Sequence, residues 1–395
     1  MCMKNEEWKE YKLGEVTDSC LGKMLDAKKN KGTPQPYLAN VNVRWGSFDL
    51  EDLPLMRFED DENERYGLKY GDVVICEGGE PGRCAIWKDQ IPNMKIQKAL
   101  HRVRCHENLD YRYLYYYLLW AGKKGLLEAY FTGTTIKHLP GDKLKIIPIR
   151  IPSLATQKEI ANILSALDDK IELNNAINRN LEEQAQAIFK NWFVDFAPFG
   201  GEMPEDWTTA SLSDIADYLN GLAMQKFRPK ESEVGLPVLK IKELRQGFSG
   251  EDAEQCSPSI KPEYIVNDGD VIFSWSGSLL VDLWCGGTCG LNQHLFKVTS
   301  QKYDKWFYYL WTKHHLDRFV FLAADKATTM GHIKRDELDK AEVFIPSKAD
   351  YEKIGRTLEP MIETIVAKRV ENQRLTTLRN ELLPKLMFDI SYIEE

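Results

Sequence analysis

Apolar side chains recur at alternating steps of three and four residues in two long segments, one in each half of the chain. The first segment covers residues 153–197 and the second covers residues 347–395. This spacing is typical of the contact seam of a coiled coil. An Ile-Pro dipeptide precedes each segment, and proline marks a helix boundary. We therefore predict two helices of roughly 40 residues, each about 60 Å long at a rise of 1.5 Å per residue.

The two predicted helices correspond position by position. Moving the apolar positions of the first helix along the chain by 194 residues gives positions that are all apolar in the second helix. Two such helices in one chain are expected to pack antiparallel against each other. The residues predicted to pair are Ile160, Leu164, Leu167, Ile171, Asn174, Asn178, Leu181, Ile188, Ile354, Leu358, Met361, Ile365, Asn372, Leu375, Leu382 and Leu386.

Polar residues interrupt both seams near their middle. In the antiparallel register that the apolar positions favour, Asn174 lies opposite Asn372 and Asn178 lies opposite Lys368. These four residues would then form one polar layer, which disfavours shifted registers and lowers the stability of the helix pair. The alternative is that these residues face solvent or a partner. Beyond this layer, we expect Phe189, Trp192 and Phe193 to form an exposed apolar cluster that makes the isolated chain poorly soluble.

The segments before each helix are also repeats of each other. WKEYKLGEVTDSCLG from Trp8 corresponds to WTTASLSDIADYLNG from Trp207, and YGLKYGDVVICEGGEPG from Tyr66 corresponds to YIVNDGDVIFSWSGS from Tyr264. Both segments alternate short β-branched runs with Gly, Pro and Asn turns and contain one aromatic helix. We predict an α/β (α+β) class with an internal repeat. The predicted parts are a mixed domain at 1–152, a helix at 153–197, a mixed domain at 198–346 and a helix at 347–395.

A search for catalytic motifs finds almost nothing. The chain has no P-loop, no strand-linked GxGxxG, no HExxH, no GxSxG and no Asn-Pro-Pro-aromatic motif of amino-methyltransferases. Asp72 and Glu77 could form a carboxylate pair, but Glu77 corresponds to Trp275 in the second copy. Eight scattered cysteines without a CxxC motif are expected to be unlinked thiols, and no metal site is expected.

Charge is distributed unevenly between the two copies. The whole chain has a formal charge of −8, which argues against a protein that simply coats phosphates. Residues 1–150 nevertheless carry +2, whereas residues 201–346 carry −6. Basic side chains interleaved with aromatic ones after residue 92 would suit phosphate contacts in the first copy. The start of the chain lacks a signal-peptide core and no long apolar run is present, so we expect a cytoplasmic protein.

The arrangement resembles the specificity (S) subunits of type I restriction–modification systems. The resemblance is carried by the paired strands GDVVI and GDVIF, by GTTIKHL and ATTMGHI, by CGLNQHLFKV, and by the helix QKEIANILSALDDKIELNNAINRNLEEQ. It implies two target-recognition domains that each read half of an asymmetric bipartite site in double-stranded DNA, with the helices fixing the spacer. It also implies two methyltransferase (M) subunits and restriction (R) subunits as partners. S-adenosylmethionine, ATP and magnesium would bind those partners, and this chain would be non-catalytic.

The resemblance and the local charge together give a set of expected DNA contacts. Arginine is suited to guanine, and asparagine or glutamine to adenine, whereas lysines contact phosphates. The expected residues are Asn40, Asn42, Arg44, Glu77, Arg83, Lys95, Lys98, Arg102, Arg104, Thr134, Thr135, Lys137, Lys240, Lys242, Arg245, Ser274, Trp275, Ser276, Gln293, His294, Thr328, Thr329 and Lys334. The alternative function is a coiled-coil scaffold that joins protein partners without reading bases.

Overall fold

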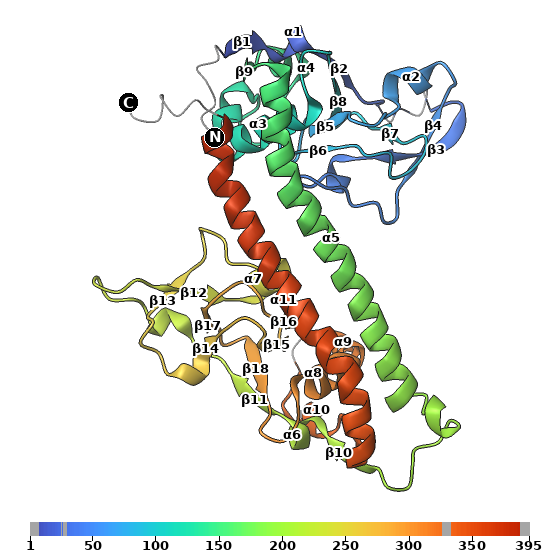
Figure 1. Ribbon diagram of the computed structural model, residues 1–395, viewed down its shortest axis with the longest axis vertical. Helices are drawn as coiled ribbons and strands as arrows, with labels where there is room; N and C mark the ends of the chain where they lie inside the picture. The colour runs from blue at the N-terminus through green and yellow to red at the C-terminus, as the bar shows by residue number, and fades with distance from the viewer. Residues whose placement is uncertain (1–7, 25, 27–29, 326–332, 388–395) are drawn as a thin grey trace. The chain divides into compact units, whose positions relative to one another are not determined.

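The structure is a computed structural model that describes residues 8–24, 26, 30–325 and 333–387 (Figure 1). It divides into two compact units. Unit 1 contains residues 1–169 and 378–395, and unit 2 contains residues 170–377. Both units mix helices with strands, as the sequence predicts. No helix in the described ranges is long and apolar enough to span a membrane.

Unit 1 is built on three small sheets. Strands β1 (Lys9–Lys12) and β9 (Pro148–Ile151) pair antiparallel. A four-stranded sheet has the order β2 (Thr17–Leu21), β8 (Leu100–Cys105), β5 (Val73–Cys76) and β6 (Cys84–Ile86). A three-stranded sheet has the order β4 (Leu55–Phe58), β3 (Thr33–Leu38) and β7 (Lys95–Ile96). The helical elements are α1 (Leu13–Val16), η1 (Asn40–Asn42), α2 (Glu62–Tyr66), α3 (Tyr111–Lys123), η2 (Leu126–Tyr130) and α4 (Gly141–Lys145).

Unit 2 repeats this plan. Strands β10 (Thr208–Ser211) and β19 (Glu342–Ile345) pair antiparallel. One sheet has the order β11 (Asp217–Asn220), β18 (Leu295–Thr299), β15 (Val271–Ser274) and β16 (Leu280–Leu283). The other has the order β13 (Gln255–Cys256), β12 (Leu236–Leu239), β17 (Cys289–Leu291) and β14 (Ile265–Val266). The helical elements are η3 (Ala197–Phe199), α6 (Leu212–Ile215), η4 (Met224–Lys226), α7 (Ile241–Gln246), η5 (Pro262–Tyr264), α8 (Lys305–His314), α9 (Leu316–Asp325) and α10 (Asp336–Asp339).

The Gly-Asp pair before β5 and β15 forms the same turn in both units. Gly71 and Gly269 each have a φ of 87°, which favours glycine. The following aspartate closes the turn, because Asp72 accepts the Lys69 N–H at 2.8 Å and Asp270 accepts the Asn267 N–H at 2.8 Å. Each aspartate also pairs with a basic side chain of the neighbouring strand. The shared motif therefore builds the scaffold, which explains why both copies keep it.

An aromatic helix forms the core beside each four-stranded sheet. In unit 1, Asp110 caps α3 by accepting the Arg112 and Tyr113 N–H groups, so the helix begins at Tyr111. Its buried face packs on Val73, Ile75 and Val103 of the sheet. In unit 2, α8 buries Trp306, Phe307, Tyr309 and Trp311 in the corresponding core.

Two helices of 40 residues, α5 (Leu154–Phe193) and α11 (Lys348–Met387), follow the mixed segments. Each helix crosses the boundary between the units, so each unit contains part of both. In unit 2 the Asn174 Nδ2 donates to the Asn372 Oδ1 at 2.9 Å and to the Glu371 Oε2 at 2.9 Å. The Asn372 Nδ2 in turn donates to the Asn175 Oδ1 at 2.8 Å. The predicted antiparallel register and its Asn174–Asn372 layer are therefore confirmed.

The apolar seam residues lie on the packed sides of these helices. In unit 1, Ile160 and Leu164 share a core with Leu383 and Met387 of α11. In unit 2, the pairing residues Leu181, Ile188, Ile354, Leu358, Met361 and Ile365 belong to or pack against one core. Leu167, Ile171, Leu375, Leu382 and Leu386 are half-buried.

One detail of the helix prediction is wrong. The aromatic cluster expected to be exposed on α5 is packed instead, since Phe189 and Phe193 contact Trp311 and only Trp192 is half-buried. Lys368, predicted to lie opposite Asn178, pairs with Glu371 of its own helix at 3.4 Å. The Asn178 Oδ1 is buried without a hydrogen-bond partner.

Candidate nucleic-acid interface

Three loops of unit 1 that the sequence singles out meet in the structure. They are the turn after β3, the β5–β6 loop and the segment after η2. The Arg83 Nη2 of the β5–β6 loop donates to the Asn40 carbonyl at 2.9 Å, and the Asn40 Nδ2 donates to the Gly78 carbonyl at 3.4 Å. The Glu77 Oε2 lies 3.3 Å from the His138 Nδ1. Side chains from three distant parts of the sequence thus share one surface.

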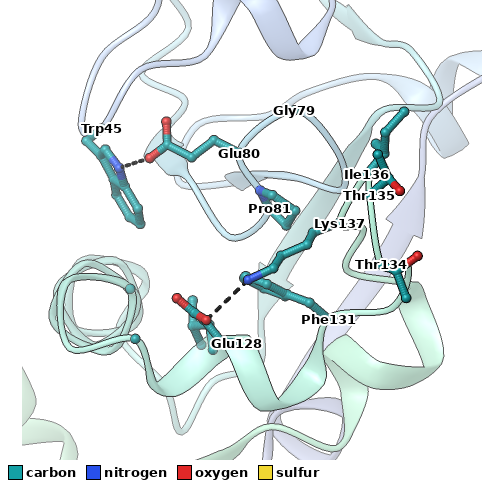
Figure 2. A pocket seen from close by; sticks show the side chains of 13 residues that line it. Trp45, Gly79, Glu80, Pro81, Glu128, Phe131, Thr134, Thr135, Ile136 and Lys137 are labelled. Carbon is teal, nitrogen blue, oxygen red and sulfur yellow. Dashed lines mark hydrogen bonds and ion pairs between the residues drawn. The ribbon is translucent and has the colours of Figure 1, made fainter.

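Part of this surface surrounds a hollow of about 560 Å³ (Figure 2). The predicted residues Thr134, Thr135 and Lys137 line it and are exposed. Lys137 pairs with Glu128 across 3.2 Å. Two further predicted residues are exposed elsewhere in unit 1, Lys98 and Arg44, and the latter lies 3.4 Å from Asp49.

Four predicted contacts of unit 1 bond to other groups of the protein, and three of them, Asn42, Lys95 and Arg102, are buried. Arg102 is 8% exposed, and its Nη1 donates to the carbonyls of Glu64 and Arg65 at 2.8 and 2.9 Å. Arg104 makes two bonds to Asp72, at 2.8 and 2.7 Å, which raise the pKa of its guanidinium. Burial therefore removes Arg102 from the phosphate contacts, whereas Arg104 is bound to Asp72 but keeps a side chain that is 31% exposed.

Lys95 and Asn42 are likewise structural. Lys95 is 3% exposed and its Nζ donates to the Asn93 carbonyl at 3.0 Å, while burial lowers the pKa of its amine. The Asn42 side chain is buried, accepting the Ala39 N–H at 2.9 Å and donating to the Asp49 carbonyl at 3.2 Å. Both side chains hold their own loops and present little polar surface to a ligand.

In unit 2 the corresponding loops also meet. The Ser276 Oγ after β15 lies 3.0 Å from the His294 Nδ1 of the β17–β18 loop. Trp275 stacks on Phe296 with 5.6 Å between ring centroids, and its Nε1 donates to the Asn220 Oδ1 at 3.0 Å. Ser274 is fully buried and bonds the Ser278 carbonyl at 2.9 Å, so the prediction that it contacts DNA is wrong. Ser276 is only 6% exposed, and its hydroxyl positions His294.

A hollow of about 380 Å³ collects four of the predicted residues of unit 2, namely Lys240, Lys242, Gln293 and His294. Both lysines are paired with acids: Lys240 with Glu254 at 2.5 Å and Lys242 with Asp252 at 2.7 Å. The hydrogen bond from Lys240 is the main reason that the pKa of Glu254 is lowered.

Of the other predicted residues, Arg245 and Lys334 are exposed and do not line this hollow. Thr328 and Thr329 lie outside the described residues.

Several residues at these surfaces were missed by the sequence prediction. Trp45 donates its Nε1 to the Glu80 Oε1 at 2.7 Å, and both line the hollow of unit 1 together with Phe131 and Glu128. In unit 2, Glu254 and Gln225 line the other hollow. Trp45 directly follows Arg44 and Glu80 lies three residues before Arg83, so adjacency to predicted residues could have found them. The remaining four, Glu128, Phe131, Gln225 and Glu254, come from segments without a motif.

Of the carboxylate pair that the sequence suggests, Asp72 is buried and bound to Arg104, so its carboxylate is engaged within the fold. Within the described ranges, no group of three or more His, Cys, Asp or Glu side chains is placed to hold a metal ion. The seven described cysteines are free thiols. Both surfaces present amide, hydroxyl, imidazole, indole and charged groups on loops.

Comparison with known proteins agrees with this description. The family described as "Type I restriction modification DNA specificity domain" matches residues 5–183 and 204–377. The chain therefore belongs to the family of type I restriction–modification DNA specificity subunits, and its function is DNA sequence recognition for such a system.

Individual relatives cover most of the chain. The type I restriction enzyme MjaIX specificity subunit of Methanocaldococcus jannaschii is 28% identical over 82% of this chain and 78% of its own length. The HindI specificity subunit of Haemophilus influenzae is 21% identical over 96% of this chain and 99% of its own. The crystal structure of an S subunit from M. genitalium has the same fold, with a TM-score of 0.61 at 16% identity over 99% of this chain and 98% of that one.

Proposed function

We propose that each unit reads one half of an asymmetric, bipartite site in double-stranded DNA. The observation that carries this proposal is the repeat itself. Both units keep one framework, including the Gly-Asp turn and the parallel pairs Leu38–Ile96 and Leu239–Leu291. The loops that meet on it differ. A shared scaffold with different loops suits two readers of different base sequences.

The side chains that differ most are suited to different base edges. After β3, unit 1 presents Asn40 and Arg44, whereas the same place after β12 presents Lys240 and Lys242. After β5 and β15 the two units carry Glu77 and Trp275, respectively. Arginine pairs with guanine, asparagine with adenine, and carboxylates accept from cytosine. The half-sites are therefore expected to be unrelated in sequence.

We propose that two M subunits bind this chain, and that R subunits join the complete complex. The acidic second unit supports this division of labour, because the net charge of −6 over residues 201–346 leaves much of the phosphate binding to partners. S-adenosylmethionine, ATP and magnesium would be held by the M and R subunits. This chain is proposed to be non-catalytic, with the spacer between half-sites fixed by α5 and α11.

A selection experiment tests this function. The chain is purified together with its M subunits and mixed with a library of random duplexes, and the bound DNA is sequenced. We expect enrichment of one gapped motif with two unrelated half-sites. Enrichment of no gapped motif, with an intact complex, would instead support a scaffold that joins protein partners without reading bases.

A further inference from the structure

One arginine of α11 connects three elements of unit 2. The Arg369 Nη1 donates to the Asp282 Oδ1 at 2.7 Å and to the Leu283 carbonyl at 3.1 Å. Its Nη2 donates to the Glu182 Oε1 of α5 at 2.7 Å. A single planar guanidinium thus binds strand β16 with one nitrogen and the opposite helix with the other. Lysine could not reproduce this, because its ammonium is a point charge without the fixed fork.

The strand that Arg369 holds leads directly to a predicted reading loop. Asp282 lies in β16, which pairs antiparallel with β15 and places Ile272 opposite Asp282. The loop between these two strands carries Trp275 and Ser276. A change in the position of β16 relative to the helices would therefore move this loop as well.

The surroundings make the connection stiff. The side chains of Arg369, Asp282 and Glu182 are 24%, 25% and 26% exposed, so water screens their charges only in part. Burial lowers the pKa of Arg369, but the charges of Asp282 and Glu182 and the hydrogen bond to Asp282 outweigh it, and the guanidinium stays charged. A second hydrogen bond also joins α11 to the mixed part of unit 2: the Gln373 Nε2 donates to the Gly247 carbonyl, which follows α7, at 3.1 Å.

Unit 1 connects its own hairpin to the helices differently, since Lys88 after β6 pairs with Asp169 of α5 at 3.7 Å. The register of β5 with β6 places Ala85 at the position of Asp282, and alanine offers no carboxylate. The contacts of Arg369 with Asp282, Leu283 and Glu182 therefore belong to unit 2 and are not part of the framework that both units share.

We propose that Arg369 is a positioning residue that holds the second reading fold at one orientation on the two helices, and so restricts the spacer length that the complex accepts. This inference rests on the proposed bipartite reading. Its guanidinium joins α11 to the β16 hairpin through Asp282 and Leu283 and to α5 through Glu182, so these bonds act on the orientation of the hairpin on the helices.

The test compares Arg369→Gln with Arg356→Gln in the chain assembled with its M subunits. Arg356 is an exposed arginine of the same helix whose Nε donates to the Glu352 carbonyl, so its substitution removes the same charge without touching the hairpin. Methylation rates are measured on duplexes that carry the wild-type half-sites with the native spacer, or with a spacer one base pair shorter or longer. Asp282→Asn, which weakens the hairpin arm alone, is measured in parallel.

For Arg369→Gln we expect discrimination against the altered spacers to fall about tenfold, the effect of losing one charge-assisted contact, while the half-site motif stays unchanged. Asp282→Asn should change discrimination in the same direction and Arg356→Gln should not change it. An unaltered spacer profile for Arg369→Gln, or an equal change for Arg356→Gln, overturns the inference. If the wild-type complex itself shows no gapped site, the proposed function fails instead.

Discussion

The buried aspartate of the Gly-Asp turn gives a quantitative test of the shared scaffold. Asp72 is 1% exposed and its carboxylate accepts three hydrogen bonds, two from Arg104 and one from the Lys69 N–H. Asp270 has a weaker environment, with a 25% exposed side chain, one bond from Lys297 at 2.8 Å and one from a backbone N–H. Replacing each aspartate by asparagine removes the charge and preserves the size.

The expected costs follow from these contacts. Breaking a buried ion pair by neutralising one partner costs about 3–5 kcal/mol. Because Arg104 is 31% exposed and recovers part of its hydration, we expect Asp72→Asn to cost about 2–3 kcal/mol. Asp270→Asn should cost about 1 kcal/mol, since that carboxylate is already partly hydrated.

Hydrogen exchange of the full chain measures both effects separately, because it reports on each unit by peptide. Amides of β5 and β6 should exchange about 30- to 150-fold faster in Asp72→Asn, and those of β15 and β16 about fivefold faster in Asp270→Asn. Asp89→Asn is the control, because Asp89 is exposed and asparagine tolerates its φ of 54°. Unchanged exchange in β5 and β6, or a larger effect from Asp270, would refute the structural role assigned to this motif.

Three further outcomes follow from the structure. His315 is buried, its Nε2 lies 2.8 Å from the Glu342 carbonyl and burial lowers its pKa to about 4, so proton uptake favours the unfolded chain. Unit 2 should therefore lose up to about 3 kcal/mol as the pH falls from about 6.5 to 4 and show no such loss above it, and His315→Gln should flatten this part of an unfolding curve measured against pH. The double substitution Asn174→Leu with Asn372→Leu should raise stability in urea by about 1–2 kcal/mol, because it removes a buried acceptor without a partner, while the preference for one spacer broadens in the methylation assay. Lys98→Ala should weaken DNA binding equally for all sequences and reduce the salt dependence of binding. Gln293→Ala should instead relax selectivity at one position of a single half-site. Binding titrations against single-base variants of the site measure both effects.

The long-range plan of the molecule could be predicted because repetition encodes it. The apolar seams alone place Asn174 opposite Asn372, since an antiparallel register is fixed once several positions must match. The Gly-Asp pairs likewise locate the same turn twice. These features depend on periodicity and order, which a single sequence displays directly.

The orientation of individual basic side chains could not be predicted in the same way. The first four residues of β8, Leu100–Val103, are buried, so the usual alternation between an inner and an outer face does not separate Arg102 from its neighbours. Arg104 is satisfied by the carboxylate of Asp72, which lies in another segment that only the fold brings near, whereas Lys95 bonds the carbonyl of Asn93 two residues before it. In the sequence, Phe189 and Phe193 look like exposed apolar residues of the helix. In the structure they share a core with the residues of α8. The exposure of these side chains depends on residues that pack around them in the fold, and the local sequence does not show those residues.

Independent reading of one half-site by each unit can be tested by a domain exchange. Residues 1–152 are replaced by the corresponding segment of another specificity subunit of the family, and the hybrid is assembled with the M subunits. The modified positions in a genome methylated by the hybrid are then sequenced. We expect one half of the gapped motif to change while the other half and the spacer are retained. A motif that changes in both halves, or in neither, would contradict it.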